Sequence, residues 1–127
     1  MQRIDSIYYG ATESKGRGVF TAMDIPEKSL IEICPVILIP KDQIPLIDRT
    51  VIYHYYFIWK DGDLALPLGY GCLYNHRETP NAEVVYDHFA LEIHIQSIRE
   101  IKEGEEITIH YHNDPEFKGS LWFEVKE

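Results

Sequence analysis

Short strand-like segments separated by turn residues are the feature that most constrains the fold of this chain. Residues 28–40 and 51–59 are rich in β-branched and aromatic side chains, which favour strands. Between the second of these segments and residues 64–66, the Asp-Gly pair within residues 60–63 is typical of a tight turn. No segment keeps a 3.6-residue period, although residues 41–50 could hold one short helix. The sequence therefore predicts a mostly β fold.

The length and composition of the chain predict one compact domain over residues 1–127. A chain of 127 residues suits a single domain and leaves no room for a second. Apolar residues make up 45% of the chain, which is enough to bury a core. The chain contains no internal repeat, low-complexity segment or linker.

The distribution of apolar residues and cysteines favours an intracellular protein, either cytoplasmic or, in a eukaryote, nuclear. No apolar run approaches the roughly 18 residues that cross a bilayer, and residues 1–5 contain no apolar stretch typical of a secretion signal. Cys34 and Cys72 are too far apart for a metal knuckle, and so few cysteines fit a reducing compartment. We expect two buried thiols, no disulfide, no zinc and no membrane association.

The charge of the chain bears on its partners. It has 12 basic and 21 acidic residues, a net charge of −9. Nucleic-acid binding needs clustered Lys and Arg, so we expect no nucleic-acid partner. A negative field would steer a lysine-rich peptide toward the protein. The same charge is also common in proteins that are acidic only to stay soluble.

Three ordered segments carry the candidate chemistry. Residues 15–20 contain Gly-Arg-Gly, residues 70–81 read Tyr-Gly-Cys-Leu-Tyr-Asn-His-Arg-Glu-Thr-Pro-Asn, and residues 104–111 read Gly-Glu-Glu-Ile-Thr-Ile-His-Tyr. Each has an ordinary interpretation when it is taken alone. The glycines would serve a turn, the Asn-His pair a turn and a half-buried polar niche, and the final tyrosine the core.

Taken together and in this order, the three segments resemble the signature segments of the SET-domain lysine methyltransferases. The resemblance covers about residues 14–114 and leaves residues 115–127 as a C-terminal tail. It implies a single SET-like domain of short curved sheets with a C-terminal pseudoknot, in which the last two segments meet. It also implies transfer of a methyl group from S-adenosylmethionine to a lysine side chain of a protein, most readily a basic one.

The resemblance also assigns the cofactor site. It places the Gly-x-Gly segment along S-adenosylmethionine, Asn75 at the amino-acid end of the cofactor, and the backbone of His76 at the adenine edge. Glycine lets the backbone approach a ligand closely, and the Asn amide offers both donors and an acceptor. Arg77 stands where the family has Ser, which changes the local hydrogen bonding but leaves a backbone contact intact. The predicted cofactor-binding residues are Gly16, Arg17, Gly18, Tyr70, Asn75 and His76.

Tyr111, at the end of the last segment, is the predicted catalytic residue. Tyr55 is the second, because it aligns with a tyrosine that many family members place before the Asn-His pair. Methyl transfer is an in-line displacement, so the catalyst must mainly align the reacting atoms and exclude water. Only the neutral amine of lysine attacks, and its ordinary pKa is about 10.4. A dry channel beside the sulfonium charge would lower that pKa, so no dedicated base is required.

We expect the lysine channel to be lined by aromatic side chains, which exclude water and attract an ammonium group. Ile109 occupies the place where relatives use Phe or Tyr to set the number of methyl groups, so product multiplicity stays open. The tail residues Trp122 and Phe123 either close the channel or form a hydrophobic latch on the core. The predicted channel residues are Phe57, Tyr86, Ile109, Trp122 and Phe123.

Two alternatives accompany this interpretation, together with an open question about assembly. His110, His112 and Asp114 spell the His-x-His-x-Asp of some metal-dependent hydrolases, although Pro115 stands where that motif usually has another histidine. A SET-like module that binds a peptide without turnover is the second alternative, and the retention of all the motif residues argues against it. A homodimer is left open, since small stand-alone domains lack the flanking segments that complete the substrate groove in larger relatives.

Overall fold

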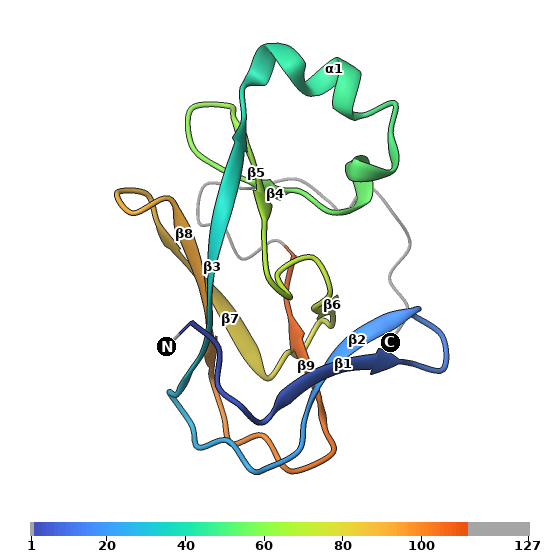
Figure 1. Ribbon diagram of the computed structural model, residues 1–127, viewed down its shortest axis with the longest axis vertical. Coiled ribbons are helices and arrows are strands. Elements are labelled where there is room, and N and C mark those ends of the chain that lie inside the picture. Colours follow the sequence, from blue (N-terminus) through green and yellow to red (C-terminus); the bar gives the residue numbers. More distant parts are fainter. Residues whose placement is uncertain (1, 112–127) are drawn as a thin grey trace.

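The computed structural model describes residues 2–111 of the chain (Figure 1). In chain order the elements are β1 (Ile7–Ala11), β2 (Arg17–Thr21), β3 (Leu30–Ile39), η1 (Lys41–Gln43), α1 (Ile44–Ile47), η2 (Val51–His54), β4 (Phe57–Ile58), β5 (Leu64–Pro67), β6 (Asn75–His76), β7 (Ala82–Asp87), β8 (Glu92–Ser97) and β9 (Glu106–Ile109). The elements η1 and η2 are single turns of 3-10 helix. The predicted mostly β fold is confirmed.

The strands form two sheets: in Figure 1, β1, β2, β6 and β9 lie toward the lower right, and β3, β4, β5, β7 and β8 lie toward the left and top. One sheet has the order β1-β2-β9-β6 and the other has the order β4-β5-β3-β8-β7. All neighbouring strands are antiparallel except β6 and β9, which run parallel. The parallel pair lets two segments that are distant in the sequence lie side by side without a hairpin between them.

The central strand β3 changes its pairing partner at a proline. Its first half, up to Pro35, pairs with β8, and its second half, from Val36 to Ile39, pairs with β5. Proline has no N–H to donate to a neighbouring strand. The carbonyl of Pro35 instead accepts a hydrogen bond from the Leu68 N–H at 2.9 Å. Pro35 therefore marks the point at which one long strand changes from pairing with β8 to pairing with β5.

Part of the segment 51–59 is not the strand that its composition predicts. Its first four residues form η2, and only Phe57 and Ile58 pair with β5. Thr50 explains the difference, because its side-chain oxygen accepts a hydrogen bond from the Ile52 N–H at 3.2 Å and caps the turn. Local capping therefore overrides the β propensity of the aromatic side chains that follow.

Two other local predictions are confirmed. Residues 41–50 hold the short helical elements η1 and α1. The Asp-Gly pair forms the tight turn between β4 and β5, where both Asp61 and Gly62 have positive φ, as this class of hairpin turn requires.

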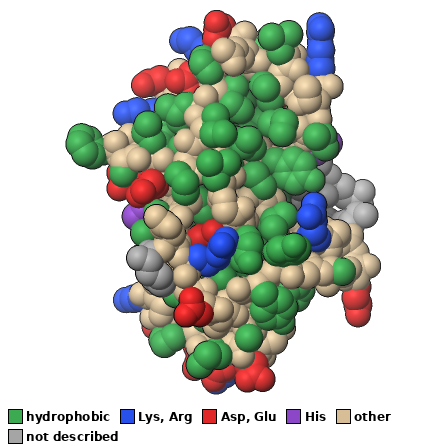
Figure 2. Space-filling model, in the orientation of Figure 1, with side chains coloured by type: hydrophobic (Ala, Val, Ile, Leu, Met, Phe, Trp, Pro, Cys, Tyr) green, Lys and Arg blue, Asp and Glu red, His purple; other side chains and the backbone are tan. Residues whose placement is uncertain are grey.

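The main core lies between the two sheets and is built from aliphatic side chains of most strands. Its fully buried members include Val19, Ile31, Ile93, Ile95 and Ile107. Figure 2 shows hydrophobic side chains gathered over the middle and upper part of one face, with charged side chains at the margins and also below the middle of the face. No helix among residues 2–111 is long and apolar enough to cross a membrane.

A buried carboxylate ties three parts of the fold together. Glu32 on β3 is only 2% exposed. One of its oxygens accepts a hydrogen bond from the Tyr74 hydroxyl at 2.6 Å, and the other accepts from the Tyr70 N–H at 3.0 Å and from Arg3 at 3.3 Å. The Arg3 guanidinium also lies 3.9 Å from the centre of the Tyr70 ring. Burial raises the pKa of Tyr74 well above its ordinary value, and the Glu32 charge adds to the rise.

Replacing Glu32 with alanine should lower the free energy of unfolding by about 3 kcal/mol. The change removes the hydrogen-bond acceptor of the buried Tyr74 hydroxyl and the ion-pair partner of Arg3. Urea titration followed by circular dichroism measures this loss. Glu92→Ala, at a partly exposed carboxylate on β8, is the control and should change the free energy by no more than about 0.5 kcal/mol. Equal losses in the two variants would contradict a special role for the buried carboxylate.

Candidate active site

The pairing of β6 with β9 brings the predicted motif segments together. Asn75 lies opposite Thr108, and His76 lies opposite Ile109. On the other side of β9, β2 pairs with it through Val19 and Ile107, so the Gly-x-Gly segment joins the same sheet. The expected meeting of the last two segments is therefore confirmed. The pseudoknot by which the family makes this meeting stays a prediction.

Asn81 holds the two segments in register. Its side-chain oxygen accepts a hydrogen bond from the Thr108 N–H at 2.8 Å, and its amide donates to the Glu106 carbonyl at 2.8 Å. The side chain is almost fully buried. A buried amide that bonds a carbonyl and an N–H of one strand acts in place of a neighbouring strand, so Asn81 extends the pairing of β9 on the side where β6 begins.

Asn75 binds the Gly-x-Gly segment directly. Its side-chain nitrogen donates to the Arg17 carbonyl at 3.0 Å and to a Glu106 carboxylate oxygen at 2.7 Å. Gly18 is required at this point, since a Cβ on it would lie 2.5 Å from that oxygen and 3.0 Å from the Asn75 nitrogen. Gly16 has a φ of 72°, which favours glycine. Nothing lies within 4 Å of the Cβ position at Gly16, so the backbone there is open to a close approach by a ligand, whereas at Gly18 the Glu106 carboxylate and the Asn75 amide fill that space.

A cavity of about 390 Å³ lies beside this arrangement, within the size range of small-molecule sites. It is lined by residues 11–15 together with Phe20, Arg77 and Glu106. Lys15 crosses from the loop to the Asn-His pair, because its ammonium group donates to the His76 carbonyl at 3.0 Å. The cavity therefore has cationic groups at Lys15 and Arg77 and anionic groups at Glu13 and Glu106.

A second, narrow cavity is lined mainly by aromatic rings. Its volume is about 20 Å³, which is enough for about one water molecule. Of the predicted catalytic and channel residues, Tyr55, Phe57 and Tyr111 all line it. The remaining lining residues are His54, Tyr56, Ile58, Gly71, Cys72 and Tyr74.

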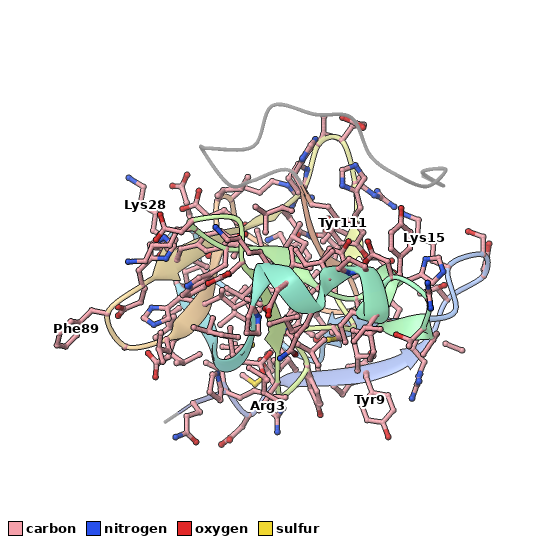
Figure 3. The ribbon with its side chains drawn as sticks, turned by 90° about the horizontal axis from the view of Figure 1, so that it is seen from above. Arg3, Tyr9, Lys15, Lys28, Phe89 and Tyr111 are labelled. Atoms are coloured by element: carbon pink, nitrogen blue, oxygen red, sulfur yellow. The ribbon has the colours of Figure 1, made fainter. Side chains whose placement is uncertain are left out.

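Tyr111 is held at this cavity by bonds at both ends of the residue. Its hydroxyl donates to the Tyr74 carbonyl at 3.1 Å, and its backbone N–H donates to Nδ1 of His76 at 2.9 Å. Burial raises the pKa of Tyr111 to about 12. The phenol is therefore neutral at physiological pH, so it can orient another group by hydrogen bonding but is not a base. Figure 3 shows Tyr111 within the fold, whereas Tyr9 projects from its outside.

His76, Glu78 and His110 form a cluster next to Tyr111 and offer ligand-type atoms within 4.8 Å of one another. Nδ1 of His76 accepts the Tyr111 N–H, so the ring proton lies on Nε2 and faces Glu78 at 3.3 Å. A metal would need the lone pair at that nitrogen instead. We interpret the cluster as hydrogen bonded. The other two residues of the predicted hydrolase motif, His112 and Asp114, lie outside the described residues.

Several predicted site residues lie elsewhere. Tyr70 packs against Arg3 and Tyr9. The Tyr86 ring contacts Trp59 and His88. Tyr86 is not one of the described residues that line the aromatic cavity. Ile109 is fully buried in the core, because its side chain points inward from β9. Trp122 and Phe123 lie outside the described residues.

The structure adds residues that the sequence interpretation did not assign to the site. Cys72 and Tyr74 line the aromatic cavity, and Lys15 and Glu106 line the larger one. All four lie inside or next to the motif segments, so proximity in the sequence was the available signal. Burial raises the pKa of Cys72 to about 11, which keeps its thiol protonated and unreactive.

Comparisons with known proteins give a consistent result. Residues 16–112 match the family model of the SET domain. The chain is 38% identical over 114 residues to the Schizosaccharomyces pombe protein described as a histone-lysine N-methyltransferase, H3 lysine-37 specific, which covers 89% of this chain and 74% of that protein. A crystal structure of a candidate histone methyltransferase from Plasmodium falciparum matches with a TM-score of 0.71 and 32% identity, over 98% of this chain and 100% of that one.

We expect the fold to lose stability at alkaline pH, because the Tyr111 phenol and the Cys72 thiol are buried. The folded-state pKa values of Cys72 and Tyr111 are about 11 and about 12, above the ordinary values of 9.0 and 10.0. Groups with raised pKa values contribute stability below the ordinary values, and that contribution is lost as the pH rises toward the folded-state values. The urea unfolding free energy should therefore fall from about pH 9 upward, and less steeply in Tyr111→Phe. A flat or rising profile would contradict the assignment.

Proposed function

This chain belongs to the SET-domain family of protein-lysine methyltransferases, and on that premise we propose that its two cavities divide the reaction between them. The larger cavity takes S-adenosylmethionine, and the narrow aromatic cavity takes the lysine side chain. One observation carries the assignment: β6 is bonded to the linings of both cavities. Asn75 and His76 bond Glu106 and Lys15 in the first, and His76 bonds Tyr111 in the second.

The reaction is the transfer of a methyl group from S-adenosylmethionine to a lysine side chain of a protein. The cofactor supplies a methyl group made electrophilic by a positively charged sulfur. The lysine nitrogen forms a bond to the methyl carbon while the carbon–sulfur bond breaks, and the electron pair of that bond stays on sulfur. Lysine must lose a proton to solvent to become a nucleophile. The remaining task of the protein is alignment and exclusion of water.

The residues around the larger cavity suit the cofactor. Gly16 allows the backbone to approach it, and the Asn75 amide oxygen with the Glu106 carboxylate can receive its ammonium group. Lys15 and Arg77 provide positive charge for its carboxylate. Arg77, the departure from the family pattern, thus lies where a positive charge is useful. Gly16, Arg17, Gly18, Asn75 and His76 remain the proposed cofactor contacts.

The aromatic cavity suits the lysine side chain. Its rings exclude water and attract a cation, and its small volume means that the surrounding rings must separate to admit the lysine side chain. The neutral Tyr111 hydroxyl, directed at the Tyr74 carbonyl, is the proposed orienting group, and Tyr55, which lines the same cavity, is the second. Burial of an ammonium group lowers its pKa, and the sulfonium charge lowers it further, so deprotonation does not require a base from this chain.

The substrate that we propose is a histone, and histone H3 in particular. The Schizosaccharomyces pombe relative is specific for H3 lysine 37 by its description, and its similarity covers most of this chain. The net charge of −9 complements a basic histone tail and would raise its rate of association. A histone substrate also implies a nuclear location. Homodimer formation, which would complete the substrate groove of a small domain, belongs to the same proposal.

Replacing Tyr111 with phenylalanine should lower methyl transfer by at least about 100-fold, because the orienting hydroxyl is lost from the reacting centre. Transfer of labelled methyl to histones measures the rate, and calorimetry measures cofactor affinity. Cofactor binding should survive in Tyr111→Phe and weaken in Asn75→Ala. Tyr9→Phe is the control, since that hydroxyl lies on the exposed edge strand β1. An unchanged rate in Tyr111→Phe would remove the proposed catalytic role.

Wild-type protein should transfer labelled methyl to histone H3 in preference to acidic proteins, and H3 in which lysine 37 is replaced by arginine should take up less label. Added salt should reduce kcat/KM, because it screens attraction between exposed charges. Mass spectrometry of the product identifies the lysine and the number of methyl groups. Transfer that is equal for acidic and basic proteins would contradict the proposed substrate class.

A further inference from the structure

We propose that Glu78 is a positioning residue for the methyl transfer reaction, because its carboxylate fixes the His76 imidazole that holds the backbone of Tyr111 at the aromatic cavity. The inference rests on the catalytic role proposed for Tyr111. Glu78 lies in the segment that connects β6 to β7, so it belongs to neither cavity lining.

The contacts form a continuous chain from Glu78 to the cavity. One Glu78 oxygen lies 3.3 Å from Nε2 of His76, and the other lies 3.2 Å from Nε2 of His110. Nδ1 of His76 then accepts the Tyr111 N–H at 2.9 Å. The His76 side chain is 2% exposed, whereas the Glu78 side chain is 58% exposed. A surface carboxylate therefore acts through a buried ring on a residue of the cavity wall.

The chemistry of the imidazole explains why the carboxylate matters. A neutral histidine carries its proton on one ring nitrogen and a lone pair on the other. Only the form with the proton on Nε2 can accept the Tyr111 N–H at Nδ1. The Glu78 carboxylate accepts hydrogen bonds and cannot donate them, so it selects this form. The bonds to His76 and then to His110 lower the pKa of Glu78, which keeps it ionised at neutral pH.

His110 makes the same carboxylate join the two motif segments. His110 follows β9 directly and precedes Tyr111, while His76 lies on β6. The two imidazole centroids are 4.5 Å apart, and the Arg77 N–H donates to the Ile109 carbonyl at 2.9 Å. Glu78 therefore holds the end of β9 against β6 at the residue before the catalytic tyrosine. A small displacement there moves the phenol relative to the reacting atoms.

A second histidine and glutamate pair provides a matched control. On β8, Glu92 lies 3.1 Å from Nε2 of His94, with the same spacing of two residues, and both side chains are about one third exposed. Among residues 2–111, neither Glu92 nor His94 lines the aromatic cavity or the larger cavity. Glu92 instead lines a separate groove beside the N-terminal residues Gln2 and Arg3. Removing Glu92 therefore tests the loss of a surface carboxylate beside a histidine without touching the proposed relay.

The test compares Glu78→Ala, Glu78→Gln and Glu92→Ala with the wild type in labelled methyl transfer to histone H3, at saturating cofactor. Glu78→Ala should lower kcat about fivefold, the factor expected from one ordinary hydrogen bond. Cofactor affinity by calorimetry should change by less than about twofold, because the larger cavity is untouched. Glu78→Gln should recover most of kcat, since its amide oxygen accepts from His76 and its nitrogen donates to His110. Glu92→Ala should match the wild type.

Nitrogen chemical shifts of the His76 ring give a readout that a merely structural role would not change. The wild type and Glu78→Gln should show the proton on Nε2, and Glu78→Ala should show a mixture of the two forms. An unchanged kcat in Glu78→Ala, equal losses in Glu78→Ala and Glu92→Ala, or a wild-type ring with its proton on Nδ1 would each overturn the inference. A normal rate in Tyr111→Phe would instead overturn the proposed function on which the inference rests.

Discussion

The parallel pairing of β6 with β9 is the interaction on which the rest of the site depends. It is short, and a two-residue parallel ladder contributes little stability alone. Asn81 adds to its stability, because its buried amide bonds the backbone of β9 at Thr108, where the ladder begins, and at Glu106, just before it. The pairing matters because β9 has β2 on its other side. One central strand thereby places the glycine segment, the Asn-His pair and Tyr111 within reach of one another.

The two sheets are joined by a polar anchor as well as by the aliphatic core. Glu32 bonds Arg3, the Tyr70 backbone and the Tyr74 hydroxyl, so it fixes the segment that leads into β6. The carbonyl of that same Tyr74 accepts from the Tyr111 hydroxyl. A buried carboxylate of this kind destabilises the fold unless all its hydrogen bonds are formed. The same bonds hold Tyr74, which lines the aromatic cavity, so the shape of that cavity depends on the stability of the fold around Glu32.

The electrostatics of the site agree with a reaction that needs alignment more than acid or base catalysis. The Tyr111 pKa of about 12 leaves a neutral hydroxyl at the cavity, and the raised pKa of Cys72 leaves a neutral thiol. Neither group competes with the lysine amine for a proton at neutral pH. Charged side chains gather instead at the larger cavity, where Lys15, Arg77 and Glu106 complement a ligand that carries both signs of charge.

The sequence by itself determined the mostly β class, the turn at residues 60–63 and the motif residues around Tyr111, because these depend on local propensity and on short fixed spacings. The prediction of a strand over residues 51–59 was wrong for residues 51–54, which form η2. The Thr50 cap outweighs the β propensity of the residues that follow it. Only the tertiary structure decided which aromatic rings share a cavity, as Tyr55 and Phe57 line it while Tyr86 packs on Trp59. It alone showed the Glu78 cluster, because side-chain contacts between β6 and the end of β9 arise from long-range pairing that no local pattern encodes.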